Sequence, residues 1–417
     1  MRQAYVIHKP ALYCKKSYHN KGEKMEREPV SGICAEDIVH YQDLARQFAK
    51  KALLPIFQGE YSDGNLSLLP EILKTAFETG IAATPDESLA GCEYGIWGGA
   101  TDEQGIMPSL LLLSIIAETC GGVAMCLHAQ GVASNLLLAA KRKLPFTPVR
   151  VGLGLQEEFC PPFLGTIISP VQDAPARITT TAVQKGNHYI INGSKSFVYS
   201  MNGIDAYVVL ARVNDQWGCF LVDANEKGIE RIDVGARTGL RACLVEQVTF
   251  NHVEIPQEAR VDDGDAREMV IRALGLNWTG MAAIGLGIAK GASAAAIKYS
   301  AERYQGGTQI EEHPAVKMLI AGAEASIAAA EATLFSLQEG SFTSFKGLKK
   351  AASAKLIIMD ICSRAVTDCL QTFGGYGYME DFGMEKRLRD VTVLKSAFGS
   401  TTYLKQLIFD IEKEGAR

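Results

Sequence analysis

The richest chemical pattern in the sequence lies in its last quarter. The run Gln371-Thr-Phe-Gly374-Gly375-Tyr376-Gly377-Tyr378 is followed by Glu385-Lys386-x-x-Arg389-Asp390. Paired glycines after a long helical stretch let the backbone approach a ligand closely. Glu385 and Arg389 stand four residues apart, which predicts an ion pair along a helix. The pattern indicates either a ligand-binding turn or a well-capped helix end.

Other motifs that could carry chemistry are weaker. Gly285, Gly287 and Gly291 suggest a dinucleotide-binding loop, but they lie inside a helical stretch with no strand before it, so helix packing explains them better. The sequence has no GxxxxGK[ST] phosphate loop and no GxSxG nucleophile turn. His128 and His313 are isolated histidines and the sequence has no spaced Cys/His cluster, so it predicts no metal site.

The elements that must position these residues follow a simple order. Residues from about Cys34 to Lys143 have helical periodicity, and β-branched alternation begins after a proline-rich stretch near Phe146. The predicted strands are Ile178–Gln184, Tyr189–Ile191, Ser196–Tyr199, Ala206–Val213, Trp217–Val222 and Gln247–Phe250, with turns at Lys185-Gly186-Asn187, Asn192-Gly193 and Asn214-Asp215. Long Ala-rich helices are predicted at Ala282–Arg303, Pro314–Gln338, Gly347–Gln371 and Glu385–Lys395.

These patterns predict a mainly helical α+β protein. The predicted domains are a flexible tail (1–30), an N-terminal helical domain (31–147), a β-barrel domain (148–262) and a C-terminal four-helix bundle (263–417).

Composition restricts the class of protein. Of the 417 residues 47% are hydrophobic and 21% are charged, and the formal net charge is −5. These values favour a soluble globular chain and give no electrostatic footprint for nucleic acid. No apolar run reaches the roughly 18 residues that a membrane span needs. The ten cysteines form no CxxC pair, so we expect free thiols and a cytoplasmic location.

Several motifs in the same order resemble the acyl-CoA dehydrogenase family. The C-terminal pattern is similar to the family's Q-x-x-G-G-x-G-[YF] followed by E-[RK]-x-x-R-D. The other similar segments are Thr79–Pro85, Tyr189-Ile-Ile-Asn-Gly193-Ser-Lys195, Gly239-Leu-Arg241 through Phe250 to Ile255-Pro256, and Lys298-Tyr299-x-x-Glu302-Arg303. The resemblance covers about residues 35–417. It implies a helical domain, a β-barrel and a four-helix bundle, in a homodimer or homotetramer.

The resemblance also implies a chemistry. FAD accepts a hydride from an acyl thioester such as acyl-CoA, while a carboxylate removes the α-proton. An electron-transfer flavoprotein is the implied electron acceptor. Arg303 and Gln371 resemble residues that complete the FAD site of a neighbouring subunit. The full set of implied FAD-binding residues is Phe197, Val198, Tyr199, Arg303, His313, Gln371, Gly374, Gly375 and Thr401.

The sequence departs from the family at the centre of that chemistry. The family's acidic T-E-P-x-x-G-S-D loop is here Ile168–Pro175, and Tyr199 replaces a threonine that binds the flavin. Gly399 occupies the usual position of the catalytic glutamate, where we expect it to leave a gap. Asn277 occupies the alternative position, and Trp278 replaces the arginine that usually follows. No catalytic residue can therefore be assigned.

Three interpretations of function follow. The first is an FAD-dependent flavoprotein that acts on an acyl thioester by altered chemistry, of desulfinase, reductase or monooxygenase type. The second is a non-catalytic partner subunit of a hetero-oligomeric acyl-CoA dehydrogenase. The third, an ordinary dehydrogenase with a base from elsewhere, is the least favoured.

Overall fold

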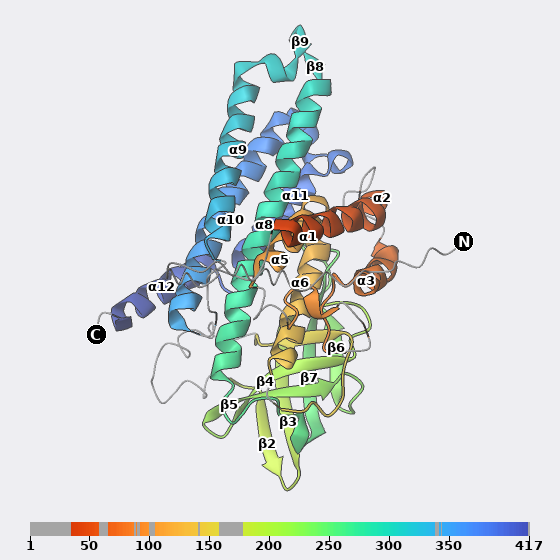
Figure 1. Cartoon of the computed structure of the whole chain (residues 1–417), viewed down its shortest axis with the longest axis vertical. Helices are drawn as coiled ribbons and strands as arrows, with labels where there is room; N and C mark the ends of the chain where they lie inside the picture. The colour runs from red at the N-terminus through yellow and green to blue at the C-terminus, as the bar shows by residue number, and fades with distance from the viewer. Residues whose placement is uncertain are drawn as a thin grey trace, which may run out of the picture.

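The computed structural model describes residues 35–57, 66–86, 89, 92–99, 105–140, 142–157, 178–337, 342 and 344–415. A sheet forms one end of the molecule and long helices extend to the other end, with the N-terminal helices packed beside the middle (Figure 1). Helices, strands and long helices thus follow in the predicted order. The predicted tail, residues 1–30, and the divergent loop Ile168–Pro175 lie outside the described residues.

The N-terminal part is helical, as its periodicity predicts. Its elements are α1 (Ala35–Phe48), a π-helical segment (Ala49–Leu53), α2 (Leu54–Phe57), α3 (Leu69–Glu78), α5 (Met107–Thr119) and α6 (Gly121–Leu138). Pro55 does not end the helical stretch, because the π-helical segment and α2 carry the chain on to Phe57. Proline is tolerated there because it stands in the first turn of α2. The apolar helices α5 and α6 are largely buried.

Seven of the described strands form one mixed sheet. They are β1 (Val151–Gly154), β2 (Thr181–Lys185), β3 (His188–Ser200), β4 (Ala206–Val213), β5 (Gln216–Asp223), β6 (Ile229–Asp233) and β7 (Leu244–Pro256). The order is β1-β4-β2-β3-β7-β6, and β5 pairs with β4. β1 and β6 were not predicted, since each is only four or five residues long.

The turn predicted at Asn192-Gly193 is instead an irregularity inside a single long strand. β3 runs through both residues, and its register against β7 shifts between Ile191 and Gly193. Gly193 has φ +141°, and a Cβ atom there would lie 2.5 Å from the Cα of Thr180. Glycine inside a strand commonly marks such a bulge or a close backbone approach. The predicted turns at Gly186 and at Asn214 are confirmed, and both residues have positive φ.

The C-terminal part is built on five helices among the described residues. They are α8 (Arg267–Glu302), α9 (Pro314–Phe335), α10 (Phe345–Thr372), α11 (Met384–Ser396) and α12 (Thr401–Gly415); the short strands β8 (Tyr304–Gln305) and β9 (Thr308–Gln309) join α8 to α9. The glycines of α8 pack helices closely, as predicted. A Cβ atom at Gly287 would lie 2.0 Å from the carbonyl oxygen of Ser114, and one at Gly291 would lie 2.2 Å from that of Glu118.

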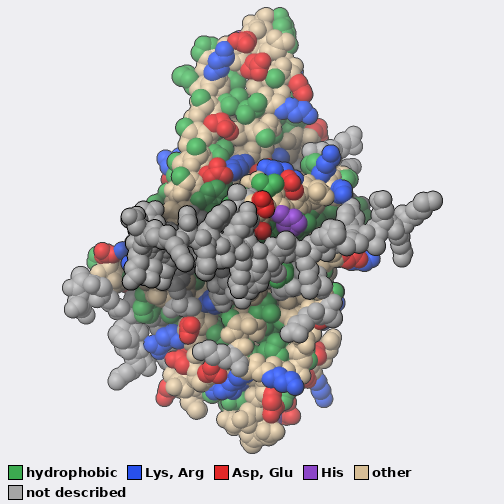
Figure 2. Space-filling view, viewed as in Figure 1, with side chains coloured by type: hydrophobic (Ala, Val, Ile, Leu, Met, Phe, Trp, Pro, Cys, Tyr) green, Lys and Arg blue, Asp and Glu red, His purple; other side chains and the backbone are tan. Residues whose placement is uncertain are grey.

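The surface gives two further facts. Two helices, α8 and α9, are long and apolar enough to cross a membrane by length and composition, and 78% of the apolar window of α8 is buried inside the protein, against 22% for α9. α8 is therefore the core helix of the bundle, while α9 carries an exposed Ala-rich face. On the described part of the face in Figure 2, basic and acidic side chains are interspersed.

Candidate functional site

The two positions that the resemblance implies for the catalytic base belong to segments in contact, because Trp278, the neighbour of Asn277, meets the turn that contains Gly399. The indole Nε1 of Trp278 donates a hydrogen bond to the carbonyl oxygen of Phe398, at 2.7 Å. A Cβ atom at Gly399 would lie 3.7 Å from the same nitrogen. α8 and the turn before α12 thus meet where the family holds its base. We call this region the inner site. It comprises Tyr199, Asn277, Trp278, Phe398 and Gly399.

The gap expected at Gly399 is filled. Gly399 has φ +125°, and a Cβ atom there would lie 2.7 Å from the ring of Tyr403. Both the backbone conformation and the aromatic neighbour oppose a larger side chain. A glutamate at this position would therefore be strained by the backbone and would meet the Tyr403 ring.

Asn277 belongs to a buried chain of neutral polar groups. Trp97 donates through Nε1 to Nδ1 of His128 at 2.7 Å, so the remaining proton of a neutral imidazole stands on Nε2. Burial lowers the pKa of His128 to about 3, and a contact with Asn277 opposes that shift. The amide of Asn277 donates to the carbonyl oxygen of Ala273 at 2.7 Å. Neither group can act as a base at neutral pH.

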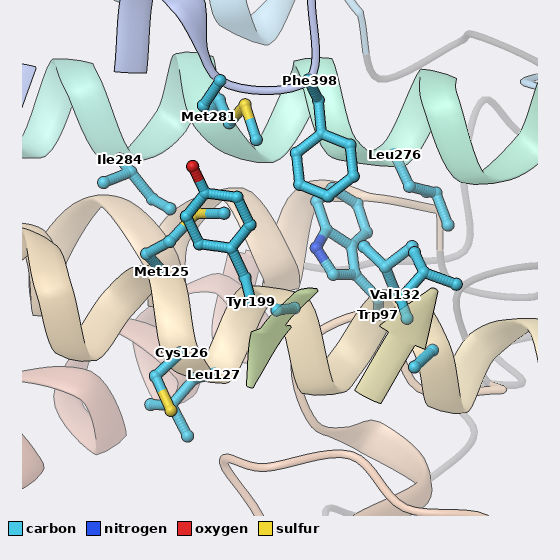
Figure 3. Close-up of a cluster of buried hydrophobic side chains, with 14 of the residues drawn as sticks. Trp97, Met125, Cys126, Leu127, Val132, Tyr199, Leu276, Met281, Ile284 and Phe398 are labelled. Atoms are coloured by element: carbon cyan, nitrogen blue, oxygen red, sulfur yellow. The ribbon is translucent and has the colours of Figure 1, made fainter. Parts of the chain in front are cut away.

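The predicted flavin wall divides between the surface and the core. Phe197 lies at an irregularity of β3 with φ +54° and is 51% exposed, whereas Val198 is buried. Tyr199 is only 8% exposed, and its ring centroid lies 5.5 Å from that of Phe398. Figure 3 shows these two rings in one cluster with Met125 of α6 and with Met281 and Ile284 of α8. Burial raises the pKa of Tyr199, so its hydroxyl keeps its proton.

The inner site does not fit a flavin stacked against a thioester. The resemblance implies that the flavin wall at Phe197–Tyr199 and the base position at Gly399 both line the space for these two planar groups. Carbon atoms in contact are 3.5–4.0 Å apart, so a single ring inserted between Tyr199 and Phe398 needs about 7 Å. The observed 5.5 Å is a direct contact between the two rings. The inner site is therefore a packed core in this structure.

A buried lysine that the sequence analysis did not single out stands beside the inner site. Lys355 of α10 is fully buried, and its ammonium contacts the carbonyl oxygens of Ala397 and Gly399, the second at 3.0 Å. Burial lowers its pKa to about 7. Helical periodicity could have indicated that Lys355 is buried, because it shares a face with the apolar residues Ala351 and Ile358.

The remaining predicted FAD residues, except Thr401 at the start of α12, gather at the far end of the bundle. We call this group the bundle tip. It comprises Arg303, His313, Gln371, Gly374 and Gly375. The Arg303 guanidinium lies 5.3 Å from the ring centroid of Tyr376, and His313 contacts the carbonyl oxygen of Gln305 at 2.9 Å. Nothing lies within 4 Å of a Cβ atom built at Gly374 or at Gly375.

The bundle tip suits an anionic ligand. The described residues give Arg303 a weak contact with Gln305 and the ring of Tyr376, and no carboxylate holds its guanidinium. Arginine in this state offers a bidentate contact to a diphosphate. Behind it, Tyr299 stacks on Phe373 with ring centroids 4.2 Å apart, which joins the ends of α8 and α10. The tip therefore presents one arginine without a carboxylate partner beside open glycines, on a surface that also carries exposed acids such as Glu302 and Glu312.

One chain cannot use the inner site and the bundle tip for the same cofactor. Asn277 and Arg303 are 26 residues apart along α8 and its C-terminus, which corresponds to about 39 Å at 1.5 Å per residue. Arg303 stands between α8 and β8, at the end of the molecule opposite the sheet (Figure 1). A ligand at the bundle tip is therefore shared with another chain or bound on its own.

The charged part of the C-terminal motif is structural. Lys386 and Asp390 form a buried ion pair, and Asp390 also accepts a hydrogen bond from the backbone of Leu240 at 2.6 Å. Arg389 pairs with Glu385, as predicted, and donates to the carbonyl oxygen of Thr238. These contacts fasten α11 to the segment that leads into β7.

Comparison with known proteins agrees with this architecture. Residues 172–253 match the family model "Acyl-CoA dehydrogenase, middle domain", and residues 279–399 match "Acyl-CoA dehydrogenase, C-terminal domain". The chain is 27% identical to cyclohexane-1-carbonyl-CoA dehydrogenase of Syntrophus aciditrophicus over 386 residues, which are 89% of this chain and 95% of that protein.

Two further relatives extend the comparison. The caffeyl-CoA reductase-Etf complex subunit CarC of Acetobacterium woodii is 28% identical over 239 residues, 55% of this chain and 62% of that one. The structure of butyryl-CoA dehydrogenase from Megasphaera elsdenii superposes with a TM-score of 0.72 at 22% identity, covering 92% of this chain and 99% of that one. By its motifs, its domain order and these similarities, the chain belongs to the acyl-CoA dehydrogenase family.

Proposed function

We propose that this chain is a non-dehydrogenating subunit of a mixed acyl-CoA dehydrogenase assembly. Its bundle tip completes the FAD site of a partner subunit of the same fold, and its own inner site is closed. The observation that carries the proposal is the contact between Tyr199 and Phe398, at 5.5 Å between ring centroids, in the same chain as an open bundle tip. The residues that would serve the chain's own flavin have diverged most. At the tip Arg303, Gln371, Gly374 and Gly375 match the family pattern, while Gly306 and Pro314 depart from it.

The chemistry of the inner site supports this proposal. Removal of an α-proton needs a positioned base. Each side chain that we have placed there is aromatic, aliphatic or an amide. Gly399 has no side chain, and Asn277 directs its amide nitrogen to a backbone carbonyl. We therefore assign no dehydrogenation step to this chain.

The bundle tip supplies the positive part of the proposal. FAD accepts a hydride from the acyl thioester when it is bound to a subunit with a complete inner site. In the mixed assembly, Arg303 holds the diphosphate of that FAD, and the open backbone at Gly374 and Gly375 lies against its adenine side. His313 and Gln371 flank this surface. The acyl-CoA substrate and an electron-transfer flavoprotein then engage the partner subunit.

A second candidate function keeps the flavin on this chain. It is an FAD-dependent reaction on an acyl thioester by altered chemistry, such as the reduction of an unsaturated acyl-CoA. Relatives named caffeyl-CoA reductase-Etf complex subunit CarC and 3-(aryl)acrylate reductase favour this candidate. It requires the Tyr199 and Phe398 rings to separate, with Phe197, Val198 and Thr401 then beside the flavin. For either candidate we propose a cytoplasmic location, supported by the seven described cysteines, which are free and buried.

The visible spectrum of the purified full chain separates the two candidates. The chain should be colourless when it is expressed alone. Co-expression with each acyl-CoA dehydrogenase-type chain of the same genome should yield one yellow mixed oligomer that reduces a dye in the presence of acyl-CoA. A yellow protein with robust acyl-CoA-dependent turnover when expressed alone would refute the partner-subunit proposal and favour the second candidate.

A further inference from the structure

The turn between α11 and α12 receives buried donors on three successive carbonyl groups. Lys355 donates to the carbonyl oxygens of Ala397 and Gly399, and Trp278 donates to that of Phe398, at 2.7 Å. Lys355 belongs to α10 and Trp278 to α8, so the two donors approach the turn from different helices. Most backbone carbonyls in a short turn are satisfied by the backbone or by water. Three consecutive side-chain donations within the core are therefore a specific arrangement.

The turn that these donors hold is conformationally costly. Phe398 has φ +49° and Gly399 has φ +125°. A bulky residue such as phenylalanine rarely adopts positive φ, and such a conformation persists only where the surroundings impose it. The ring of Phe398 is 5% exposed, because this conformation points it into the core. The donors therefore hold the conformation that places Phe398 against Tyr199.

Lys355 is suited to this role by its isolation from acids. It is fully buried, and among the described residues the structure gives it no carboxylate partner. A buried ammonium group is costly unless strong acceptors surround it. The two carbonyl oxygens of the turn are those acceptors, so the lysine and the turn stabilise one another.

We infer that Lys355 and Trp278 are positioning residues that clamp the 397–399 turn and thereby keep the inner site closed. This inference rests on the proposed function, because it explains what holds the closed inner site. One half of the clamp is the Lys355 amine from α10, and the other half is the Trp278 indole from α8. Tyr403 completes it from α12, since its ring fills the space beside Gly399. The clamp acts on the backbone of the turn, and neither donor touches a substrate.

Hydrogen–deuterium exchange of the full chain tests the clamp. In Trp278→Phe, which keeps a buried ring but removes the donor, the amides of residues 397–402 should exchange about tenfold faster, as for loss of one neutral hydrogen bond. In Lys355→Met the same amides should exchange about 10–100-fold faster, because two hydrogen bonds to the turn are lost. The sheet should keep the exchange rates of the parent chain in both variants.

Two control variants match these changes. Trp217→Phe removes a buried indole N–H that has no hydrogen-bond partner, so exchange at 397–402 should not change. Lys350→Met removes an exposed lysine from the same helix as Lys355 and should also leave the turn unchanged.

The outcomes are separable from those of the proposed function. If both Trp278→Phe and Lys355→Met leave exchange at 397–402 at the rate of the controls, the clamp does not exist. If Lys355→Met does not fold, Trp278→Phe alone decides, and exchange equal to that of Trp217→Phe overturns the inference. Failure of the proposed function would appear instead as a flavin spectrum in the parent chain, without any change in the exchange of the variants.

Discussion

At the scale of single residues, the inner site lacks a catalytic base, and an aromatic ring fills the space beside the usual position of that base. A glycine in place of the glutamate removes the carboxylate, and the ring of Tyr403 then takes the space beside it. Asn277 keeps hydrogen-bonding capacity without basicity, next to a histidine whose pKa burial lowers to about 3. Restoring one carboxylate would therefore not restore the reaction.

Substitution of Gly399 tests this view. Gly399→Ala should lower the free energy of unfolding by about 1–3 kcal/mol, because it strains a backbone with φ +125° and meets the Tyr403 ring. Urea denaturation of both chains measures the change. Gly322→Ala is the matched control, since it lies in α9 with nothing within 4 Å of the new Cβ atom, and it should be neutral or stabilising. Equal stability of the two variants would show that the turn tolerates a side chain.

The same residues predict the activity of the chain when it is expressed alone. With no base at positions 277 or 399, α,β-dehydrogenation of saturated acyl-CoAs should be lower by about 10²–10⁴-fold than in a chain with the base. Acyl-CoA-dependent dye reduction over several chain lengths, with FAD added, measures this. Gly399→Glu should give no gain. Robust turnover by the parent would mean that a base acts there which we have not identified.

At the scale of elements, buried ion pairs fix the segments that frame the inner site. Lys195 of β3 and Glu157 are buried and lie 2.7 Å apart, and Thr179 and Thr180 also donate to the Glu157 carboxylate. Burial alone would raise the pKa of Glu157, but the Lys195 ammonium and these hydrogen bonds lower it to about 2. The pair therefore anchors the strand that carries Tyr199.

Removal of Lys195 tests the importance of this pair. Lys195→Met should lower the free energy of unfolding at neutral pH by about 3–5 kcal/mol, because an unpaired carboxylate stays buried. The double variant Lys195→Met with Glu157→Gln should recover much of this loss. Urea denaturation of the three chains at one pH measures both changes, and no recovery in the double variant would contradict the electrostatic explanation.

The pH dependence of the same pair has a definite sign. The pKa of Glu157 is lowered on folding from 4.5 to about 2, so the pair stabilises the parent above about pH 4.5 and this contribution is lost as the pH falls toward 2. In Lys195→Met, burial acts without the opposing ammonium and raises the pKa of Glu157. As the pH falls from neutral to about 4, the free energy of unfolding of the variant should therefore rise relative to that of the parent. A stability difference that stays constant with pH would exclude this account.

Sequence reasoning was most successful where periodicity and turn residues determine an element. The long C-terminal helices and the turns at Gly186 and Asn214 follow directly from those signals. It was less successful where tertiary contacts decide. Gly193 has the signature of a turn but forms a bulge against Thr180, and Pro55 does not end its helix.

The candidate site shows the same division. Motif spacing identified positions 277 and 399 as the two places of the base, because recognisable residues lie near each of them in the sequence. Motif spacing did not predict that Trp278 contacts the 398–399 turn. It could not predict that Tyr403 fills the gap or that Lys355 holds the turn. Both depend on how α10 and α12 pack against the turn, and no local sequence pattern determines that packing.

At the scale of the whole molecule, the structure presents a closed inner site near the sheet and an open bundle tip with Arg303 about 39 Å away along α8. Tyr376 holds the Arg303 side chain by a cation–π contact, so the guanidinium loses little freedom when it binds a diphosphate. Because the inner site and the bundle tip are too far apart to share one cofactor, the proposed role of the bundle tip requires a second chain.

Substitution of the tip tests this point in the mixed oligomer. Arg303→Ala should weaken FAD binding by about 1.5–3 kcal/mol, since a charge-assisted contact to the diphosphate is lost. Flavin fluorescence after gel filtration of the co-expressed complex measures the retained FAD. Arg364→Ala removes an exposed arginine of α10 that pairs with Asp360, and it should leave the flavin content unchanged. Equal FAD retention by both variants would place Arg303 outside the site.

The assembly itself is the last prediction. We expect the full chain to sediment as at least a dimer, because the bundle tip serves another chain and α9 exposes most of its apolar window. An Ala-rich helical face of this kind is stable in water when a second protein surface covers it. Sedimentation equilibrium over a range of concentrations measures the mass, with flavin absorbance recorded at each radius. Flavin should travel only with species that contain the partner subunit. A stable 45 kDa monomer that carries FAD would contradict both the assembly and the division of labour between its subunits.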